Sequence, residues 1–69
     1  MAEMQITING RPKQLEQGSS VRDLLQKLNL SGPVAVEINQ QICPKKMHSQ
    51  TILKNADVLE IVTIVGGGS

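Results

Sequence analysis

The residues best suited to chemistry in this 69-residue chain are the three consecutive glycines Gly66, Gly67 and Gly68, which Ser69 follows. Glycine has no side chain and the greatest backbone freedom, so these residues bury no apolar surface and lose much conformational entropy if they are fixed. Extended at roughly 3.3 to 3.6 Å per residue, three glycines reach about 10 Å, which lets the main chain alone enter a narrow enzyme channel. The pattern predicts a flexible tail that serves for access.

A glycine carboxylate at the end of such a tail is sterically unhindered, but its negative charge makes it a poor acyl electrophile. Chemistry there requires activation, for instance adenylation with ATP, after which the acyl carbon can accept sulfur and form a thiocarboxylate. The chain would then need no catalytic side chain of its own. A plain linker has the same composition, Gly-Gly-Gly-Ser. Function is favoured because the glycines follow a strand directly, without the polar residues that commonly end a domain.

Cys43 and His48 are the single cysteine and the single histidine of the chain. One residue of each kind can build neither a disulfide nor a zinc site, so we predict no metal. Cys43 stands beside Pro44 without a basic neighbour and is interpreted as a small apolar filler. His48 is predicted to be an ordinary surface or loop residue. Because no nucleophile, base and acid can be assembled, we predict a carrier or substrate protein and not an enzyme.

The composition bounds the class of protein. Hydrophobic residues make up 39% of the chain, which contains no Phe, Tyr or Trp, so a small aliphatic core is expected. The formal charge is +1 without a polybasic block, which argues against a nucleic-acid partner. The start Met1–Met4 does not resemble a signal peptide, and no apolar run reaches membrane-spanning length. We therefore expect a cytoplasmic protein, monomeric on its own, with no nucleic-acid or membrane partner.

The first third of the chain predicts a hairpin. Apolar residues alternate with polar ones over Met4–Ile8, as in a half-buried strand. Asn9 and Gly10 suit the positive φ angles of a type I′ turn, so a second strand over Lys13–Glu16 should pair antiparallel. Pro12 cannot donate within a sheet, which places the second strand at an edge.

A helix is predicted from Val21 onward. Ser20 and Asp23 have the spacing of a capping box, with Asp in place of the usual Glu or Gln. The next residues form one apolar stripe at helical spacing, at Val21, Leu24, Leu25 and Leu28. Asn29 tolerates a left-handed helix end and Gly32-Pro33 prevents continuation, so about 8 to 10 helical residues are expected.

The remaining elements complete one mixed sheet. A third strand is predicted over Val34–Ile38, a short segment over Ile42–Pro44, and irregular structure from Lys45. The run Val58–Val65 is aliphatic at nearly every position, which suggests a central strand beside the first and partly covered on each side. One helix packed across one face of a four- to five-stranded mixed sheet is an α+β arrangement. We predict a domain over residues 1–65 and a glycine-rich tail over residues 66–69.

The last strand also offers a candidate partner surface. Val58, Val62 and Ile64 share one face, and so small a domain has no second layer to cover the side opposite the helix. The opposite assignment, in which Leu59, Ile61 and Val65 are exposed, stays open. In either case one apolar set is left uncovered.

Five segments carry a family resemblance. They are Met4–Ile6, Asn9-Gly10, Val21–Leu25, Val36–Asn39 and Ile61–Gly68. They are spread from Met4 to Gly68, over nearly the whole chain, and this span resembles the thiamine-biosynthesis sulfur carrier proteins, the small ubiquitin-like partners of thiazole formation.

This resemblance implies a β-grasp fold and a site at Gly68, with Gly67 and Gly66 completing the tail. It also implies that a partner resembling ubiquitin-activating enzymes, an adenylyltransferase, uses ATP to adenylate Gly68, which becomes a thiocarboxylate and donates sulfur to thiazole synthase. No cofactor would be bound to the carrier itself. Ser69 departs from the family pattern, and we expect it to be removed before use; if it is retained, the tail would serve only for docking.

Three other functions are compatible with a small β-grasp chain. The small subunit of molybdopterin synthase shares the fold and the glycine tail, but its members tend to carry aromatic and proline residues before the glycines, and Ile61–Val65 has none. A stand-alone regulatory or RNA-binding module is disfavoured by the near-neutral charge and the missing aromatics. A protein-conjugating modifier would be distinguished by isopeptide bonds to lysines of its targets.

Overall fold

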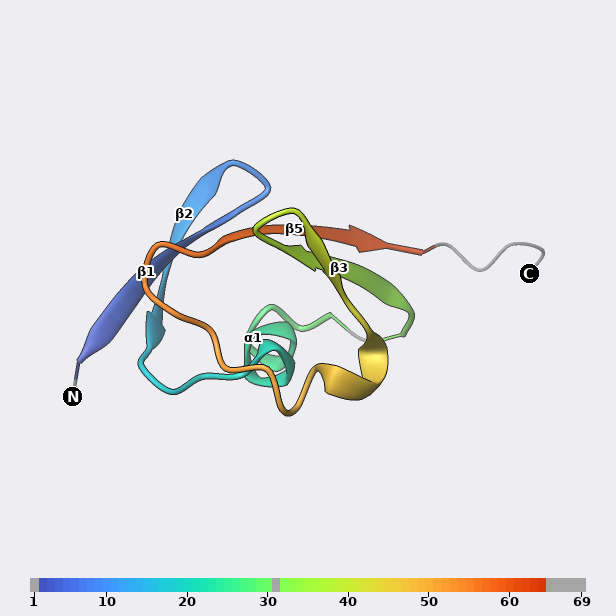
Figure 1. Cartoon of the computed structure of the whole chain (residues 1–69), viewed down its shortest axis with the longest axis horizontal. Helices are drawn as coiled ribbons and strands as arrows, with labels where there is room; N and C mark the ends of the chain where they lie inside the picture. The colour runs from blue at the N-terminus through green and yellow to red at the C-terminus, as the bar shows by residue number, and fades with distance from the viewer. Residues whose placement is uncertain (1, 31, 65–69) are drawn as a thin grey trace.

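The computed structural model describes residues 2–30 and 32–64. It contains, in chain order, β1 (Glu3–Ile8), β2 (Arg11–Glu16), α1 (Val21–Lys27), β3 (Val34–Ile38), β4 (Gln41–Cys43), the 3-10 helix η1 (Lys45–Met47) and β5 (Val58–Thr63). The strands form one five-stranded sheet in the order β2-β1-β5-β3-β4 (Figure 1). The predicted mixed sheet with one main helix is confirmed.

The first hairpin closes through a two-residue turn. Asn9 and Gly10 have φ angles of 50° and 83°, the positive values that a type I′ turn requires. Pairing resumes at once, because Ile8 lies opposite Arg11, and β2 is therefore two residues longer than predicted. The sheet order places β2, with Pro12, at an edge as predicted.

Helix α1 begins with the predicted capping box. The Ser20 hydroxyl accepts a hydrogen bond from the Asp23 N–H at 3.1 Å, and the Asp23 carboxylate accepts one from the Ser20 N–H at 3.0 Å. The helix ends at Lys27, with Leu28 as its C-cap, because Asn29 takes a φ of 61°. It has 7 residues and is thus shorter than the 8 to 10 predicted.

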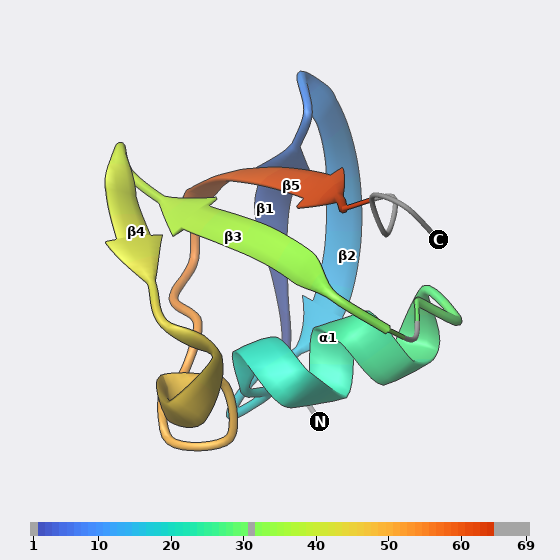
Figure 2. The same cartoon turned by 90° about the vertical axis from the view of Figure 1, so that its right-hand side faces the viewer.

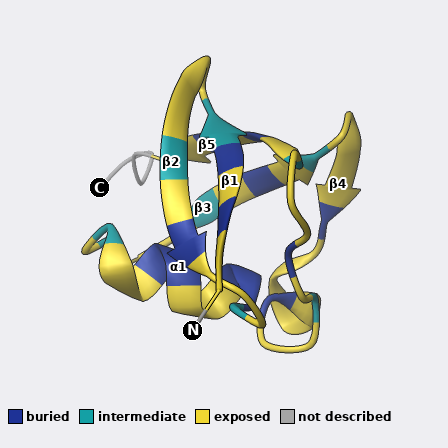
Figure 3. Cartoon of the chain, turned by 90° about the vertical axis from the view of Figure 1, so that its left-hand side faces the viewer, coloured by how far each residue is buried: buried dark blue, intermediate teal, exposed yellow. Residues whose placement is uncertain are grey.

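The core lies between α1 and one face of the sheet, which we call the inner face (Figure 2). Buried and exposed bands alternate along β1, as the two-residue period of a strand requires (Figure 3). The core is aliphatic apart from Met4 and Cys43, and its other members are Ile6, Leu15, Val21, Leu24, Leu25, Val36, Leu53, Leu59 and Ile61. The opposite side of the sheet is the outer face.

Strand β5 occupies the middle of the sheet, as predicted. It runs parallel to β1, with Thr7 opposite Val58, and antiparallel to β3, with Ala35 opposite Val62. The strand ends at Thr63, earlier than predicted, and Val65 lies outside the described residues. The cover of the two faces of β5 is unequal, because Leu59 and Ile61 are buried while Val58 and Val62 are about half exposed. In the part of the chain that the structure describes, a helix packs against the inner face only.

Candidate functional site

The predicted reactive segment, Gly66–Gly68 with Ser69, lies outside the described residues. The structure defines the strand that leads to it. Since β5 is parallel to β1, it points away from the end of the domain where β1 begins (Figure 1). The glycines therefore follow the central strand of a rigid sheet, and the geometry of β5 decides where that segment starts.

Two asparagine side chains fix β5 from both sides. Asn9, in the turn between β1 and β2, donates from Nδ2 to the Ile61 carbonyl at 3.0 Å and accepts from the Ile61 N–H at Oδ1 at 2.9 Å. On the other side Asn39, in the turn between β3 and β4, accepts from the Val58 N–H at 3.0 Å. At Ile61 and Val58 these side-chain amides make the hydrogen bonds that backbone peptide groups of β1 and β3 would make if those strands continued. They therefore stabilise β5 beyond the ends of its neighbouring strands.

This role of the asparagines was not predicted. Asn9 was assigned to a turn only, and both residues take positive φ angles, 50° at Asn9 and 51° at Asn39. The available signal was that an asparagine stands first in each hairpin turn, directly after β1 and directly after β3. Only the sheet order brings both turns against β5, and that order is a tertiary property.

The predicted partner surface lies on the outer face. Val58 is 48% exposed, Val62 58% and Ile64 51%. Leu59 and Ile61 point the other way and are buried in the core. The alternative assignment is thus wrong for Leu59 and Ile61, and its third member, Val65, is not among the described residues. The outward direction of the set is settled, whereas its use by a partner stays a prediction.

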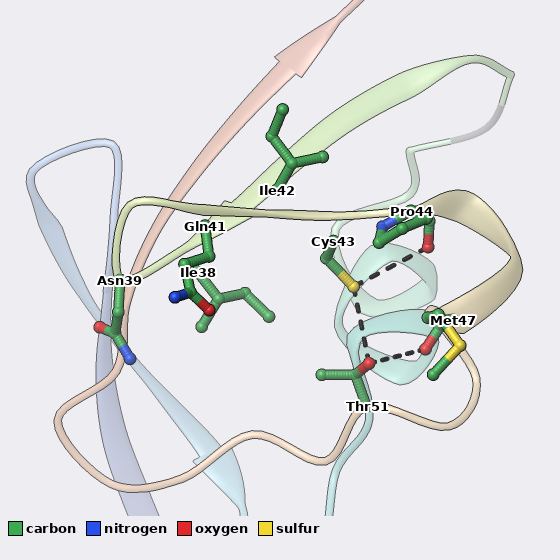
Figure 4. Close-up of a pocket in the computed structure, with 8 residues that line it drawn as sticks. All are labelled: Ile38, Asn39, Gln41, Ile42, Cys43, Pro44, Met47 and Thr51. Atoms are coloured by element: carbon green, nitrogen blue, oxygen red, sulfur yellow. Dashed lines mark hydrogen bonds between the residues drawn. The ribbon is translucent and has the colours of Figure 1, made fainter.

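Cys43 is buried, as an apolar filler should be, at the side of an open groove of about 360 Å³ next to β4 (Figure 4). Its Sγ lies 3.6 Å from Thr51 Oγ1 and 3.9 Å from the Pro44 carbonyl oxygen. Thr51 Oγ1 in turn donates to the Met47 carbonyl at 2.8 Å. The thiol is held by weak, local contacts, which match a packing role.

His48, predicted to be a surface or loop residue, does lie in a loop but is not at the surface. It follows η1 in a turn and is buried, with Nε2 at 3.2 Å from the carbonyl oxygen of Cys43. The turn contacts the start of α1, where the Arg22 N–H donates to the His48 carbonyl at 3.0 Å. The ring therefore links β4 to the η1 turn beneath the sheet. This is a structural role that the local sequence did not reveal.

Within residues 2–30 and 32–64, no three His, Cys, Asp or Glu side chains come together in a way that could hold a metal ion. The helices of that same part of the chain are too short and too polar to cross a membrane.

Comparison with known proteins identifies the family. The model of the ThiS family matches residues 6–68, which include all three glycines of the terminal run. The chain belongs to the ThiS family. The match contains the whole sheet from Ile6 onward, α1 and the predicted site at Gly68.

Relatives of this ThiS-family chain include a carrier of similar length and a much longer enzyme. The sulfur carrier protein ThiS of Escherichia coli is 33% identical over 66 residues, which cover 94% of this chain and 100% of that protein. A thiazole synthase of Paramagnetospirillum magneticum is 40% identical over 67 residues, 96% of this chain. The chain spans only 21% of the length of that thiazole synthase.

A solved structure supports the same assignment. The crystal structure of the thiamine biosynthesis protein ThiS from Geobacter metallireducens superposes with a TM-score of 0.79 at 29% identity. The superposition covers 94% of this chain and 100% of the Geobacter chain. The five-stranded mixed sheet with its single α-helix is thus a β-grasp fold, as the resemblance implied.

Proposed function

We propose that this chain is the sulfur carrier of thiamine biosynthesis and that Gly68 carries the sulfur as a C-terminal thiocarboxylate. The observation that carries the proposal is the ThiS-family match over residues 6–68, which extends through the last glycine. The full-length similarity to the Escherichia coli sulfur carrier protein ThiS supports it. As a member of this family, the chain is a carrier and not an enzyme.

The chemistry follows from the poor reactivity of a carboxylate. A Gly68 carboxylate oxygen attacks the α-phosphate of ATP on a partner adenylyltransferase, and pyrophosphate leaves. Hydrosulfide, the simplest sulfur nucleophile, then attacks the acyl carbon and displaces AMP, and loss of the remaining S–H proton leaves the thiocarboxylate. The partner binds and uses the ATP, and the carrier supplies only the acyl group.

The domain places this acyl group where a partner can take it. Residues 1–65 act as the β-grasp body, and residues 66–69 act as the tail that enters the partner. The asparagine contacts at Val58 and Ile61 support this division, because they attach β5 to the hairpin turns on both sides of it. Glycines at positions 66–68 place no side chain between the body and the acyl carbon.

Thiazole synthase is the proposed acceptor of the sulfur. The support is that a protein named thiazole synthase in Paramagnetospirillum magneticum contains a region 40% identical to this chain. Two activities joined in one polypeptide act at a high effective concentration, which suits a carrier and its acceptor. The proposed docking surface for the partner enzymes, the adenylyltransferase included, is the exposed set Val58, Val62 and Ile64, on the strand that leads to the tail.

The direct test is the intact mass of two forms of the chain, one ending at Gly68 and one retaining Ser69. Each is incubated with ATP, the adenylyltransferase of the same host and a sulfur source. The Gly68 form should gain the mass difference between sulfur and oxygen, and the Ser69 form should not, because a serine carboxylate brings a side chain into the activating site. If the Gly68 form is adenylated and sulfur is never incorporated, the sulfur-carrier function is wrong.

A further inference from the structure

The charged side chains are divided unequally between the two faces of the sheet. Register and alternation place four of the six acidic residues at outward positions, Glu3, Glu16, Glu37 and Glu60, and all four are exposed. None of the seven Lys and Arg residues of the chain stands at an outward position of the described strands. They lie in the inner register of β2, in α1, in η1 and in loops, at Arg11, Lys13, Arg22, Lys27, Lys45, Lys46 and Lys54. A chain with a formal charge of +1 thus has a strictly acidic outer face.

The other two acidic residues have structural partners. Asp23 accepts from the Ser20 N–H in the capping box. Asp57 accepts from the Lys54 N–H at 2.8 Å and from Asn39 Nδ2 at 3.0 Å. The outward glutamates are therefore the carboxylates that the fold itself does not need.

The outward glutamates form two pairs of like charge. Glu37 on β3 lies directly opposite Glu60 on β5, and Glu3 on β1 lies directly opposite Glu16 on β2. Directly opposite side chains of an antiparallel pair have Cβ atoms about 4.5 to 5.5 Å apart, and like charges there are destabilising. The isolated fold gains nothing from either arrangement.

The two pairs differ in their surroundings. Glu60 lies between Val58 and Val62 along β5, and Ala35 is opposite Val62. Ile42, which is 76% exposed, is opposite Glu37 on its other side. The Glu37–Glu60 pair is thus enclosed by exposed apolar side chains, whereas the Glu3–Glu16 pair lies at the far end of the first hairpin, among polar residues such as Gln5 and Gln14.

We propose that the outer face docks a partner protein whose apolar contact surface carries an arginine that binds Glu37 and Glu60 together. This inference rests on the proposed function, because it gives the chemistry of the surface that the adenylyltransferase presents to β5. A guanidinium is planar and has five donors in a fixed fork, so it can bind two adjacent carboxylates. Apolar contacts around the pair exclude water, which strengthens the ion pairs beyond their value at an open surface. The cation also removes the repulsion that the free carrier bears.

The test compares two double variants, Glu37→Gln with Glu60→Gln, and Glu3→Gln with Glu16→Gln. Each removes one like-charge pair, and both change the net charge equally, so the second is a matched control. Affinity for the purified adenylyltransferase is measured by calorimetric titration at low and high salt. The Glu37 and Glu60 variant should bind about tenfold more weakly or worse, with a smaller loss of affinity on adding salt. The control should bind within about twofold of the original chain, with its salt dependence nearly unchanged.

Thermal unfolding of the same variants separates docking from folding. The Glu37 and Glu60 variant should have an unchanged or higher midpoint, because it loses a repulsive pair. Unchanged affinity, or equal weakening in both double variants, would overturn the arginine site. If the chain binds in this pattern but never gains sulfur, the docking site stands and the proposed function is wrong. If sulfur is loaded equally well with and without the Glu37–Glu60 pair, at enzyme concentrations below saturation, the proposed function stands and the docking site is wrong.

Discussion

The two faces of the sheet use the same strands for different purposes. On β5, Leu59 is fully buried and Ile61 nearly so, while their neighbours Val58 and Val62 are about half exposed. The inner aliphatic side chains pack against α1 at positions set by the two-residue period, and among the described residues the buried polar side chains have hydrogen-bond partners, such as Ser20 in the capping box. The outer side chains have water on one side and pairs of like charge beside them.

This difference teaches where to look for function in a chain with no catalytic constellation. Burial of aliphatic side chains explains the inner face completely, because it supplies the main favourable free energy of folding. Strand propensity accounts for valines on an exposed strand face, but it does not account for two directly opposed glutamates among them. The outer face and the segment after β5 are therefore the parts whose properties must be explained by partners.

The largest expected effect is a loss of folding stability when a side chain of the inner face is truncated. Leu24→Ala removes a fully buried side chain from α1 and leaves a cavity, at a cost of about 2 to 5 kcal/mol. A chain of this size has a free energy of unfolding of roughly 3 to 10 kcal/mol, so the loss is large. Urea denaturation followed by circular dichroism measures it. Val62→Ala on the outer face is the control and should change the unfolding free energy by less than about 0.5 kcal/mol; equal losses would erase the distinction between the faces.

The next effect concerns the support that both faces share. Asn9→Ala loses two hydrogen bonds to Ile61 and places alanine at a φ of 50°, so it should cost about 1 to 3 kcal/mol of unfolding free energy. Asn9→Gly loses the same bonds without the strain of positive φ and should cost less. Hydrogen exchange of the Ile61 amide should rise in both variants. A protected Ile61 amide would show that the asparagine does not hold β5.

A third change acts on binding instead of folding. Val62→Ala should weaken binding to the adenylyltransferase about tenfold, because truncating an apolar anchor at the centre of an interface typically costs more than 1 kcal/mol. Calorimetric titration gives the dissociation constant, and the exposed but distant Ile52→Ala serves as the matched control. If Ile52→Ala weakens binding more than Val62→Ala does, the docking surface lies elsewhere.

The smallest effect tests the helix that closes the inner face. Ser20→Ala removes the hydroxyl that caps α1 and should lower the unfolding free energy by about 1 kcal/mol. Ser20→Thr keeps an acceptor oxygen and should retain most of that stability, as measured by the urea midpoint. Partner affinity should stay the same in both, since α1 lies on the face away from the proposed interface. Lost affinity with a normal midpoint would put α1 in the interface.

Much of the fold was predictable because it is local. The alternation over Met4–Ile8, the turn at Asn9 and Gly10, and the capping box at Ser20 each depend on neighbouring residues, and the structure confirms all three. The central place of β5 followed from its aliphatic character. The family could be identified from the sequence because its motifs extend along the whole chain.

The remainder depended on contacts between distant segments. His48 was predicted at the surface or in a loop, yet it is buried in the turn after η1, where its carbonyl accepts a hydrogen bond from the Arg22 N–H of a distant segment. The hydrogen bonds between Asn9 and Ile61 join residues that are 52 positions apart in the sequence. Likewise, the pairing of Glu37 with Glu60 is a matter of strand register, which no pattern within a single strand specifies.

The measurement that tests the account most directly is made on a chain shortened to end at Gly66. The core of the described residues ends at Ile61, so the shortened chain should keep the urea midpoint of the original, and its outer face should still bind the adenylyltransferase within a few-fold. Intact mass after incubation with ATP, the adenylyltransferase and a sulfur source should then show no added sulfur. Added sulfur on the shortened chain, or loss of its folding, would contradict the claim that the sheet supports the carrier and the last glycines carry the chemistry.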